Sequence, residues 1–468
     1  MPEHMPRQTF NSNKKRMSRI HFIFIAAITV FLYFEIMTQV WFVKLLGGYL
    51  VKVWVPPLLL FIYVLIKKLV RNENLLEISF LNVMLVSYAL FGLTSMFLKE
   101  ETFHLAIKYY LIMIAPVWFY AVMINQFRNN RDIELMIKVL LVCCFISSLY
   151  VYFLGAKYSS VASGETIEEV KTSAGNILVL NKGALFGSKE AEVQKVTTAG
   201  YEQGKYCGML APVILFGLLF FLRARRKSKY LFLAMSGFML IQVVLTISRA
   251  GIASTFIGIV FLTALIYIHE KSERTKIILL STSALILITI ILASRYEMNL
   301  ILVRFAEILS NLGIKQVNHF LDILGFSSMI KGSSYLDPHL YSIGRSLEAF
   351  YAQPLFGNGY TFATFEINEH NRYFFILVSS GLLTFIPYFF FLGGLTLFIR
   401  KAVRQLKHFK LPGINYSYLF YACAVMFLVK LLNEGMETMY YWIWFALAMA
   451  WIRNSRRDLH TSGELIRK

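Results

Sequence analysis

Three residues in the second half of the sequence carry groups that could bind a phosphate and activate a hydroxyl. Arg249 lies in the segment 246–251, Arg345 in an amphipathic stretch, and His370 just before a long hydrophobic run. A planar guanidinium can hold a phosphate through two parallel hydrogen bonds. An imidazole exchanges its proton near neutral pH and can take one from a sugar hydroxyl. These residue types therefore favour a reaction between a hydroxyl and a phosphate-activated group.

Each of the three residues also has a purely structural interpretation. Arg249 could anchor the chain to lipid headgroups, as long basic side chains often do. His370 could be a surface histidine near a helix start, where polar residues are common. Arg345 and Glu348, spaced i,i+3, could form an exposed ion pair worth less than about 1 kcal/mol. The choice between the chemical and the structural interpretation depends on whether the fold brings the three residues to one surface.

The sequence contains no motif typical of a bound metal or nucleotide. HExxH and paired CxxC spacings are absent, as are P-loop patterns and an Asp-rich motif of the kind that metal-dependent glycosyl transfer uses. We therefore predict metal-independent chemistry without a cofactor. The four cysteines lie in or at the edge of hydrophobic runs and predict no disulfide framework: Cys143, Cys144, Cys207 and Cys423.

The elements that must position these residues are predicted to be transmembrane helices. Hydrophobic residues make up 57% of the 468-residue chain and charged residues only 16%, against about 25% charged in soluble domains. A bilayer core needs about 20 apolar residues per helix, and such runs recur along the whole chain. Lipid cannot satisfy backbone polar groups, and the runs lack the alternating polarity of a β-barrel. We predict an all-α fold with a single integral membrane domain over residues 1–468.

Short basic segments separate the predicted spans and set their orientation. The twelve spans cover residues 20–37, 49–66, 78–98, 105–125, 134–154, 207–222, 230–247, 250–268, 277–293, 373–398, 415–432 and 438–452. Lys and Arg concentrate in 14–19, 67–71, 128–131, 223–229, 271–276, 400–410 and 453–457. With both termini in the cytoplasm, all of these segments are cytoplasmic, as the positive-inside rule requires. The net charge of +20 therefore indicates membrane topology rather than nucleic acid binding.

Two long loops fall on the outer face in this orientation. The first, 157–205, is rich in Ser, Gly, Thr, Val and Glu and has no helical period. The second, 294–372, has apolar residues at helical spacing over 298–312 and 339–353, which predicts two surface helices. A turn is predicted over 354–359, where proline ends the second helix and two glycines permit positive φ.

The predicted orientation brings Arg249, Arg345 and His370 to the same side of the membrane. This convergence favours a shared site over three unrelated surface residues. A proton-coupled transporter would instead show acidic residues near the bilayer centre, and half-helices broken at matching positions of two repeats. The sequence shows neither pattern.

The order of these parts resembles the O-antigen ligase and O-antigen polymerase superfamily of bacterial membrane glycosyltransferases. The resemblance covers roughly residues 195–395. The first five spans match only in being hydrophobic. The matching parts are the Gly-containing polar stretch 200–205, the Ser-Arg-small-Gly turn 248–251, Arg345 ahead of the segment 354–359, and His370-Asn371 followed by Gly381.

The resemblance implies an inverting, metal-independent glycosyltransferase with a GT-C-like fold and no cofactor. Its donor would be a glycan on undecaprenyl pyrophosphate. Arg249 and Arg345 match the family's pyrophosphate-binding arginines, and His370 matches its catalytic histidine. The site would lie on the periplasmic face of the bacterial inner membrane. The physical chemistry agrees, because a phosphate leaving group gains from charge-assisted hydrogen bonds at a low-dielectric surface.

Supporting residues and partners follow from the same resemblance. The family often has a further arginine before the sixth helix, and the nearest basic residues here are Lys195 and Lys205. Glu369 and Asn371 flank the histidine and are further supporting candidates. The acceptor would be a second lipid-linked glycan, or lipid A core in a ligase, among membrane lipids and with a chain-length regulator as partner. We favour a repeat-unit polymerase; a ligase and a lipid-linked glycan transporter are the alternatives.

Overall fold

The computed structural model describes residues 17–34, 62, 66, 79–100, 102–127, 129–161, 203–223, 228–245, 249–269, 336–363, 371–408, 414–433 and 439–461. All regular structure within these residues is helical, and none of them forms a strand. The all-α prediction is therefore confirmed for the part of the chain that the structure describes.

Polar residues cap the starts of several helices, where lipid would leave backbone N–H groups without partners. Ser18, Ser79 and Thr102 each accept a hydrogen bond of 3.3 Å from the N–H three residues further on.

In chain order the helices are α1 (Arg19–Tyr33), α5 (Phe80–Lys99), α6 (Phe103–Gln126), α7 (Asn130–Val161), α10 (Gln203–Arg223), α11 (Ser228–Leu245), α12 (Arg249–His269), α17 (Leu336–Ala352), α18 (Arg372–His408), α19 (Ile414–Lys430), the 3-10 turn η2 (Leu431–Asn433) and α20 (Met439–Thr461).

Ten of the twelve predicted spans fall on these helices. The helix starts differ from the prediction by at most four residues, at 130 against 134 and at 203 against 207. Three helices continue beyond their apolar runs: α7, α18 and α20. A helix needs apolar side chains only where it meets lipid, so polar residues can prolong it outside. The spans predicted at 49–66 and 277–293 lie outside the described residues, apart from Ile62 and Ile66, which are helical.

Three of the described helices are long and apolar enough to cross a membrane. They are Phe80–Lys99, Phe103–Ile124 and Arg372–Gln405. Exposed apolar side chains such as Leu90, Phe389 and Phe390 lie on two of these helices. These helices support a membrane protein, whereas the full set of twelve spans stays a prediction.

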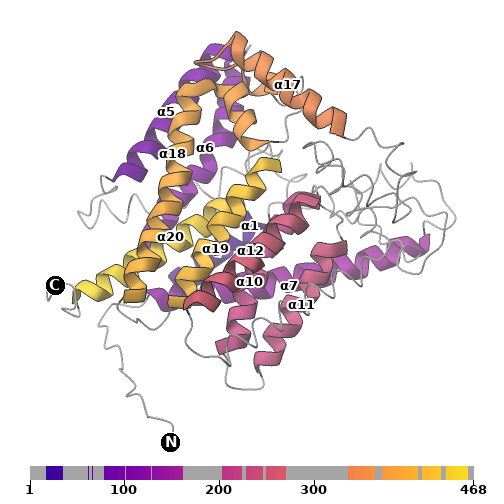
Figure 1. The fold of residues 1–468 in the computed structure, drawn as a ribbon, viewed down its shortest axis with the longest axis vertical. Coiled ribbons are helices and arrows are strands. Elements are labelled where there is room, and N and C mark those ends of the chain that lie inside the picture. Colours follow the sequence, from indigo (N-terminus) through magenta and orange to yellow (C-terminus); the bar gives the residue numbers. More distant parts are fainter. Residues whose placement is uncertain are drawn as a thin grey trace, which may run out of the picture.

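The helices form two groups that are joined by a central pair (Figure 1). On one side α5 packs against α6 and α18, and on the other α10 packs against α11 and α12. Between them, α19 contacts α12 and α18, and α20 contacts α6 and α7. α17 extends obliquely from the top of the first group and contacts α18. The functional residues must therefore be sought at the ends of two adjoining helix groups.

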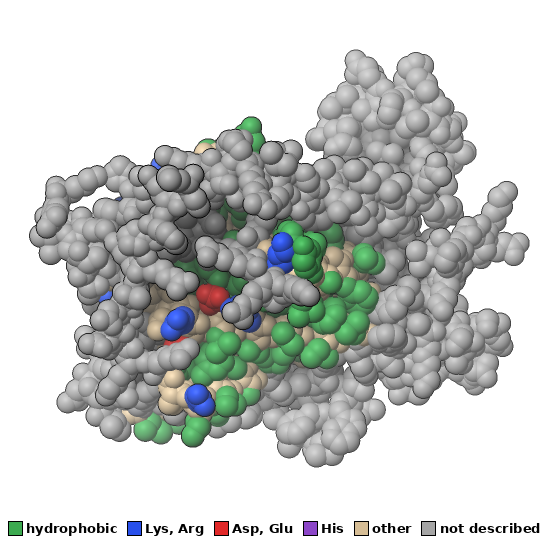
Figure 2. Space-filling view, turned by 90° about the horizontal axis from the view of Figure 1, so that it is seen from below, with side chains coloured by type: hydrophobic (Ala, Val, Ile, Leu, Met, Phe, Trp, Pro, Cys, Tyr) green, Lys and Arg blue, Asp and Glu red, His purple; other side chains and the backbone are tan. Residues whose placement is uncertain are grey.

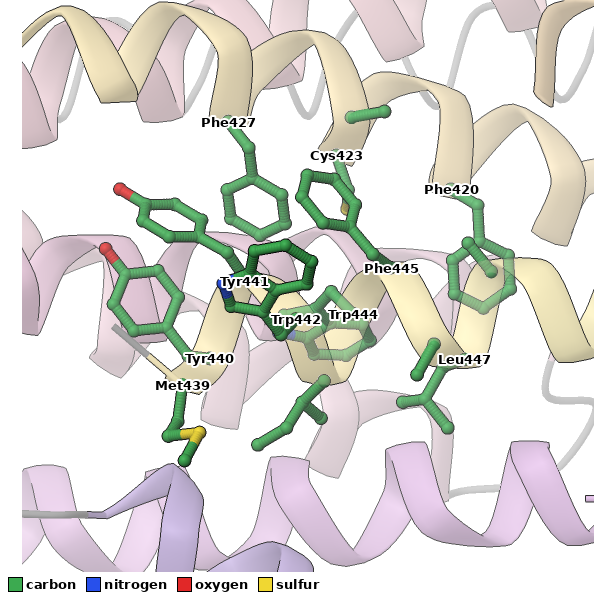
Figure 3. Close-up of a cluster of buried hydrophobic side chains, with 14 of the residues drawn as sticks. Phe420, Cys423, Phe427, Met439, Tyr440, Tyr441, Trp442, Trp444, Phe445 and Leu447 are labelled. Atoms are coloured by element: carbon green, nitrogen blue, oxygen red, sulfur yellow. The ribbon is translucent and has the colours of Figure 1, made fainter. Parts of the chain in front are cut away.

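Two tryptophans of α20 lie in a cluster of buried hydrophobic side chains (Figure 3) and contact both groups. Residues i and i+2 point to nearly opposite sides of a helix, so Trp442 and Trp444 reach different neighbours. Trp442 stacks on Phe391 of α18 with ring centroids 5.5 Å apart. Trp444 stacks on Phe216 of α10 at 5.1 Å and donates its indole N–H to the Tyr33 hydroxyl at 3.1 Å. The buried indole N–H of Trp444 is thus satisfied inside an aromatic core.

One end of the bundle gathers chain segments that were predicted to be cytoplasmic. Arg453 of α20 donates to the carbonyls of Ile124 (2.6 Å) and Phe127 (3.2 Å), and Arg456 donates to Gln405 of α18 (2.9 Å). Seen from below, Lys and Arg side chains lie among hydrophobic ones with few acidic groups (Figure 2). We call this the basic end. The contacts agree with the predicted grouping of basic segments, and the side of the membrane stays a prediction.

The two long predicted loops are described only in part. Helix α7 continues to Val161 and α10 begins at Gln203, so helices replace both ends of the loop predicted at 157–205. In the second loop, α17 confirms a helix where one was predicted at 339–353, starting three residues earlier. Its place at the outer surface stays a prediction. The surface helix predicted at 298–312 lies outside the described residues.

Candidate functional site

The tenth predicted span is bent rather than straight. Gly381 interrupts α18 with φ 71° and ψ −176°. The guanidinium carbon of Arg372 lies 5.8 Å from the centroid of the Tyr388 ring. A straight helix would separate residues sixteen positions apart (388 − 372) by about 24 Å, further than these two side chains can bridge. The chain therefore bends back sharply at Gly381, and the start of the half-helix 372–380 comes to lie beside the second half of α18.

The loop 354–359 fills the break in α18. In a continuous helix the N–H groups of residues 382 and 383 would bond the carbonyls of 378 and 379. All four of these groups find partners in the loop instead, which satisfies backbone groups that lipid would leave unpaired. Asn358 N–H donates to the Val378 carbonyl (2.7 Å), Gly359 to Ser379 (3.0 Å), Leu382 to Pro354 (2.8 Å) and Leu383 to Leu355 (3.3 Å).

The turn predicted at 354–359 is confirmed, with positive φ at both glycines. Gly357 has φ 71° and Gly359 has φ 96°. A Cβ on Gly357 would lie only 2.5 Å from the backbone nitrogen of Ser380. Glycine is therefore required here both for its conformation and for the close approach of two backbones.

The end of α5 holds this loop in place. The Glu100 carboxylate accepts the N–H groups of Tyr360 and Thr361, the latter at 3.1 Å, and the Thr361 hydroxyl at 2.6 Å. Ser95 donates to the carbonyl of Phe356 and also lies 3.3 Å from that of Ser379. One helix thus fixes the loop and the half-helix together.

We expect Glu100→Ala to lower the melting temperature of the purified protein. The substitution leaves three donors without their carboxylate, and hydrogen bonds to charged groups contribute about 1.5–3 kcal/mol each. The neighbouring Lys99→Ala is the control, because Lys99 makes an exposed bond to Gln353 (2.8 Å) and should have little effect. Equal melting temperatures for the two variants would show that Glu100 does not hold the loop.

A buried guanidinium stands at the start of the half-helix. Arg372 is 1% exposed, and its guanidinium lies 3.4 Å from the Tyr88 hydroxyl and 5.4 Å from the centroid of the Phe375 ring. Charges within membrane helices are costly and mark functional sites by default. The faces of Phe375 and Tyr388 stabilise the cation. Arg372 therefore locks the half-helix against α5 and carries positive charge into the bundle.

Tyr360 extends the cluster of aromatic rings beside Arg372. Its ring stacks on Tyr109 of α6 at 4.6 Å and meets the edge of Phe375 at 5.0 Å. Burial raises the pKa of the Tyr360 phenol to about 12, although the charge of Arg372 acts in the opposite sense. The phenol is therefore neutral at pH 7 and does not offer a negative charge to Arg372.

Asn371 caps the half-helix. Its side-chain oxygen accepts the N–H groups of Tyr373 (3.0 Å) and Phe374 (3.3 Å). The positive end of the helix dipole and the charge of Arg372 act in the same direction here, which favours an anion near the start of the half-helix. The capping role explains Asn371 structurally and fixes the residue that directly follows His370.

The other predicted site residues are described unevenly. Arg249 is the first residue of α12, and Lys205 is the third residue of α10. Arg345 lies on α17 and is exposed. His370, Glu369 and Lys195 lie outside the described residues. The convergence of Arg249, Arg345 and His370 at one site therefore stays a prediction.

Sequence reasoning missed the residues that organise this region. Arg372 stands at the end of a hydrophobic run, where a basic residue is usually interpreted as reaching the headgroups. Glu100 lies between two predicted spans and belongs to none of the motifs considered above. The signals in the sequence for this region were Gly381 within a predicted span and the glycines of 354–359. The two segments lie far apart in sequence, and the loop 354–359 fills the break at Gly381. Comparison of the chain with protein-family models and with curated proteins gives no match.

Proposed function

We propose that this chain is a membrane glycosyltransferase that polymerises undecaprenyl-pyrophosphate-linked repeat units into a surface polysaccharide. The reaction would take place at the outer face of the bacterial inner membrane, opposite the basic end. The observation that carries the proposal is the half-helix 372–380. It begins directly after His370 and Asn371, and Arg372 adds a buried positive charge at its start. This arrangement supports a proton acceptor next to a binding site for a diphosphate.

The proposed step transfers a glycan from one lipid carrier to another. His370 takes the proton of an acceptor sugar hydroxyl, and the hydroxyl oxygen forms a bond to the anomeric carbon of the donor. The bond from that carbon to the diphosphate oxygen breaks with its electron pair on oxygen, which inverts the sugar centre. The diphosphate leaves as an anion. Arg249 and Arg345 stabilise the charge that develops on it, so neither a metal nor a nucleotide is needed.

The bent helix gives His370 a rigid neighbour on one side. Asn371 is fixed by its cap, and Arg372 is fixed by Tyr88 and two aromatic rings. A catalytic group needs its position held to within about 1 Å, because a shift of that size can lower the rate about 100-fold. Glu369, on the other side of the histidine, has an acidic side chain that could orient the imidazole.

Competing acceptors in one reaction test the polymerase against the ligase. The full chain is reconstituted in vesicles with lipid-linked repeat units as donor, and lipid A core is offered together with further repeat units. We expect a ladder of lengthened lipid-linked glycans. Glycan attached to lipid A core without lengthening would favour the ligase, and no transfer to either acceptor would contradict both.

A transporter of lipid-linked glycan is the second candidate, and the break at Gly381 favours it. In transporters, half-helices direct their positive N-termini at anionic substrate groups, and the half-helix 372–380 has this form. A transporter needs the positive end for binding only and needs no proton acceptor. Replacing His370 therefore separates the two candidates.

We expect Arg249→Lys to leave glycan transfer at least tenfold below wild type. Lysine keeps the charge, but a point charge cannot reproduce the two parallel hydrogen bonds of a guanidinium to a phosphate. Transfer is measured with purified lipid-linked repeat units. Arg225→Lys in the predicted cytoplasmic segment 223–229 is the control and should be fully active. If the Arg249→Lys variant transferred glycan at the wild-type rate, Arg249 would be only a membrane anchor.

A further inference from the structure

A second polar region lies between α7, α10 and α11. Two contacts set its geometry. The Tyr206 hydroxyl of α10 donates to the Ser148 hydroxyl of α7 at 3.2 Å, and the Cys207 thiol lies 3.8 Å from the carbonyl of Val243 in α11. Adjacent residues of α10 therefore contact both neighbouring helices at one level. Phe145 and Phe238 meet edge to face at 5.8 Å and close the third side, between α7 and α11.

Gln242 lies within this three-helix junction. It directly precedes Val243 and is one helical turn beyond Phe238, which faces α7. Its side chain is fully buried, and among the described residues neither its amide nitrogen nor its amide oxygen has a hydrogen-bond partner. An unsatisfied buried polar group costs about 1–3 kcal/mol, and the cost is higher in a membrane span. A leucine or methionine would pack here without that cost, so the amide indicates a ligand.

The position of Gln242 indicates what the ligand is. Gln242 lies three residues before the end of α11, and Arg249 begins α12 after a connection of only three residues, 246–248. Lys205 directly precedes Tyr206 on α10. Arg249, which was predicted to bind pyrophosphate, and Lys205, which was predicted as a supporting residue, thus adjoin the junction in sequence. A primary amide donates two hydrogen bonds and suits phosphate oxygens, yet it carries no charge that would need compensation in the empty site.

We propose that the Gln242 amide binds a phosphate oxygen of the lipid-linked diphosphate, next to Arg249, and that the pair Ser148 and Tyr206 lines the same site. This inference deepens the proposed function and rests on it for the identity of the ligand. It assigns the diphosphate a neutral donor inside the bundle in addition to the arginines. It also predicts that the site distinguishes a diphosphate from a single phosphate at the membrane surface.

Gln242→Leu tests the inference through direct binding. We expect the variant without ligand to be at least as stable to heat as wild type, because the substitution removes an unsatisfied amide. Its affinity for undecaprenyl diphosphate in detergent should fall tenfold or more, since a hydrogen bond to a charged group is lost. Gln242→Met is the second variant and should behave in the same way. A clear loss of thermal stability in both variants would mean that the amide is bonded within the fold, and would overturn the inference.

Ser236→Ala is the matched control on the same helix. Ser236 is also buried without a hydrogen-bond partner in the described part of the chain, but it packs against Gly217 nearer the basic end. This variant should bind undecaprenyl diphosphate like wild type. Undecaprenyl monophosphate and phosphatidic acid vesicles are the comparison probes, and their weaker binding should not depend on Gln242. Unchanged diphosphate binding by Gln242→Leu would mean that an internal water serves the amide, and would also overturn the inference.

The binding test is independent of glycan transfer. If Gln242→Leu weakens diphosphate binding while the wild-type chain transfers no glycan to any acceptor, the proposed enzyme function fails and the binding site stands. If transfer proceeds and Gln242→Leu binds the diphosphate with wild-type affinity, the proposed function is supported and the proposed Gln242 site is wrong. The two proposals are therefore separable in the same preparation.

Discussion

Replacing Gly381 with alanine should destabilise the protein and lower glycan transfer about 100-fold. Gly381 has φ 71° and ψ −176°, a region that is accessible essentially only to glycine and that costs other residues about 1–3 kcal/mol. A Cβ would also collide with the carbonyl group of Leu355 in the docked loop. The loop would have to leave the break, which would expose the four backbone groups that it satisfies. The half-helix would then lose the support that fixes Asn371 and Arg372.

Gly393→Ala is the matched control in the same helix. A Cβ at Gly393 meets no atom of the described residues within 4 Å, and the residue has helical geometry. Alanine is favoured over glycine in a helix by about 1 kcal/mol, so this variant should melt at the same temperature as wild type or slightly higher. Melting temperatures in detergent and transfer in vesicles are compared for the two variants. Equal behaviour of Gly381→Ala and Gly393→Ala would show that α18 is not broken in solution.

The helices could be predicted from the sequence because lipid imposes a simple rule. A long apolar run must satisfy its backbone within itself, so its composition alone fixes a helix and its approximate bounds. The bounds of α5 and α6 therefore differ from the prediction by no more than two residues. The break in α18 could not be predicted in this way. It depends on the distant segment 354–359 supplying hydrogen bonds, and such a partner is not visible in a local pattern.

The candidate site was predictable only in part for a related reason. Residue type identifies Arg249, Arg345 and His370 as capable of phosphate binding and proton transfer. The role of Arg372 depends on its burial, which comes from the reversal at Gly381 that brings it beside Tyr88. A charge next to a hydrophobic run has the same local sequence whether it reaches the headgroups or is folded inward. Burial is thus a tertiary property, and it decides which interpretation of the charge is correct.

Replacing His370 with alanine should abolish lengthening of the glycan while leaving binding of the lipid-linked donor intact. A positioned general base contributes about 100- to 10,000-fold to a rate, so the turnover number should fall by at least 100-fold with little change in donor affinity. Transfer is followed with purified lipid-linked repeat units in vesicles that contain the full chain. The melting temperature of the variant is measured in parallel, because a fall would point to a structural role.

His104→Ala is the control for a general effect of losing an imidazole. His104 is exposed in the first turn of α6, and α6 begins beside the end of α5 that holds the loop with Glu100. Its replacement should leave transfer unchanged. If His370→Ala lengthens glycan at the wild-type rate, no proton acceptor is needed at the start of the half-helix. The positive end of the half-helix would then serve binding alone, and another group would have to take the proton of the acceptor hydroxyl.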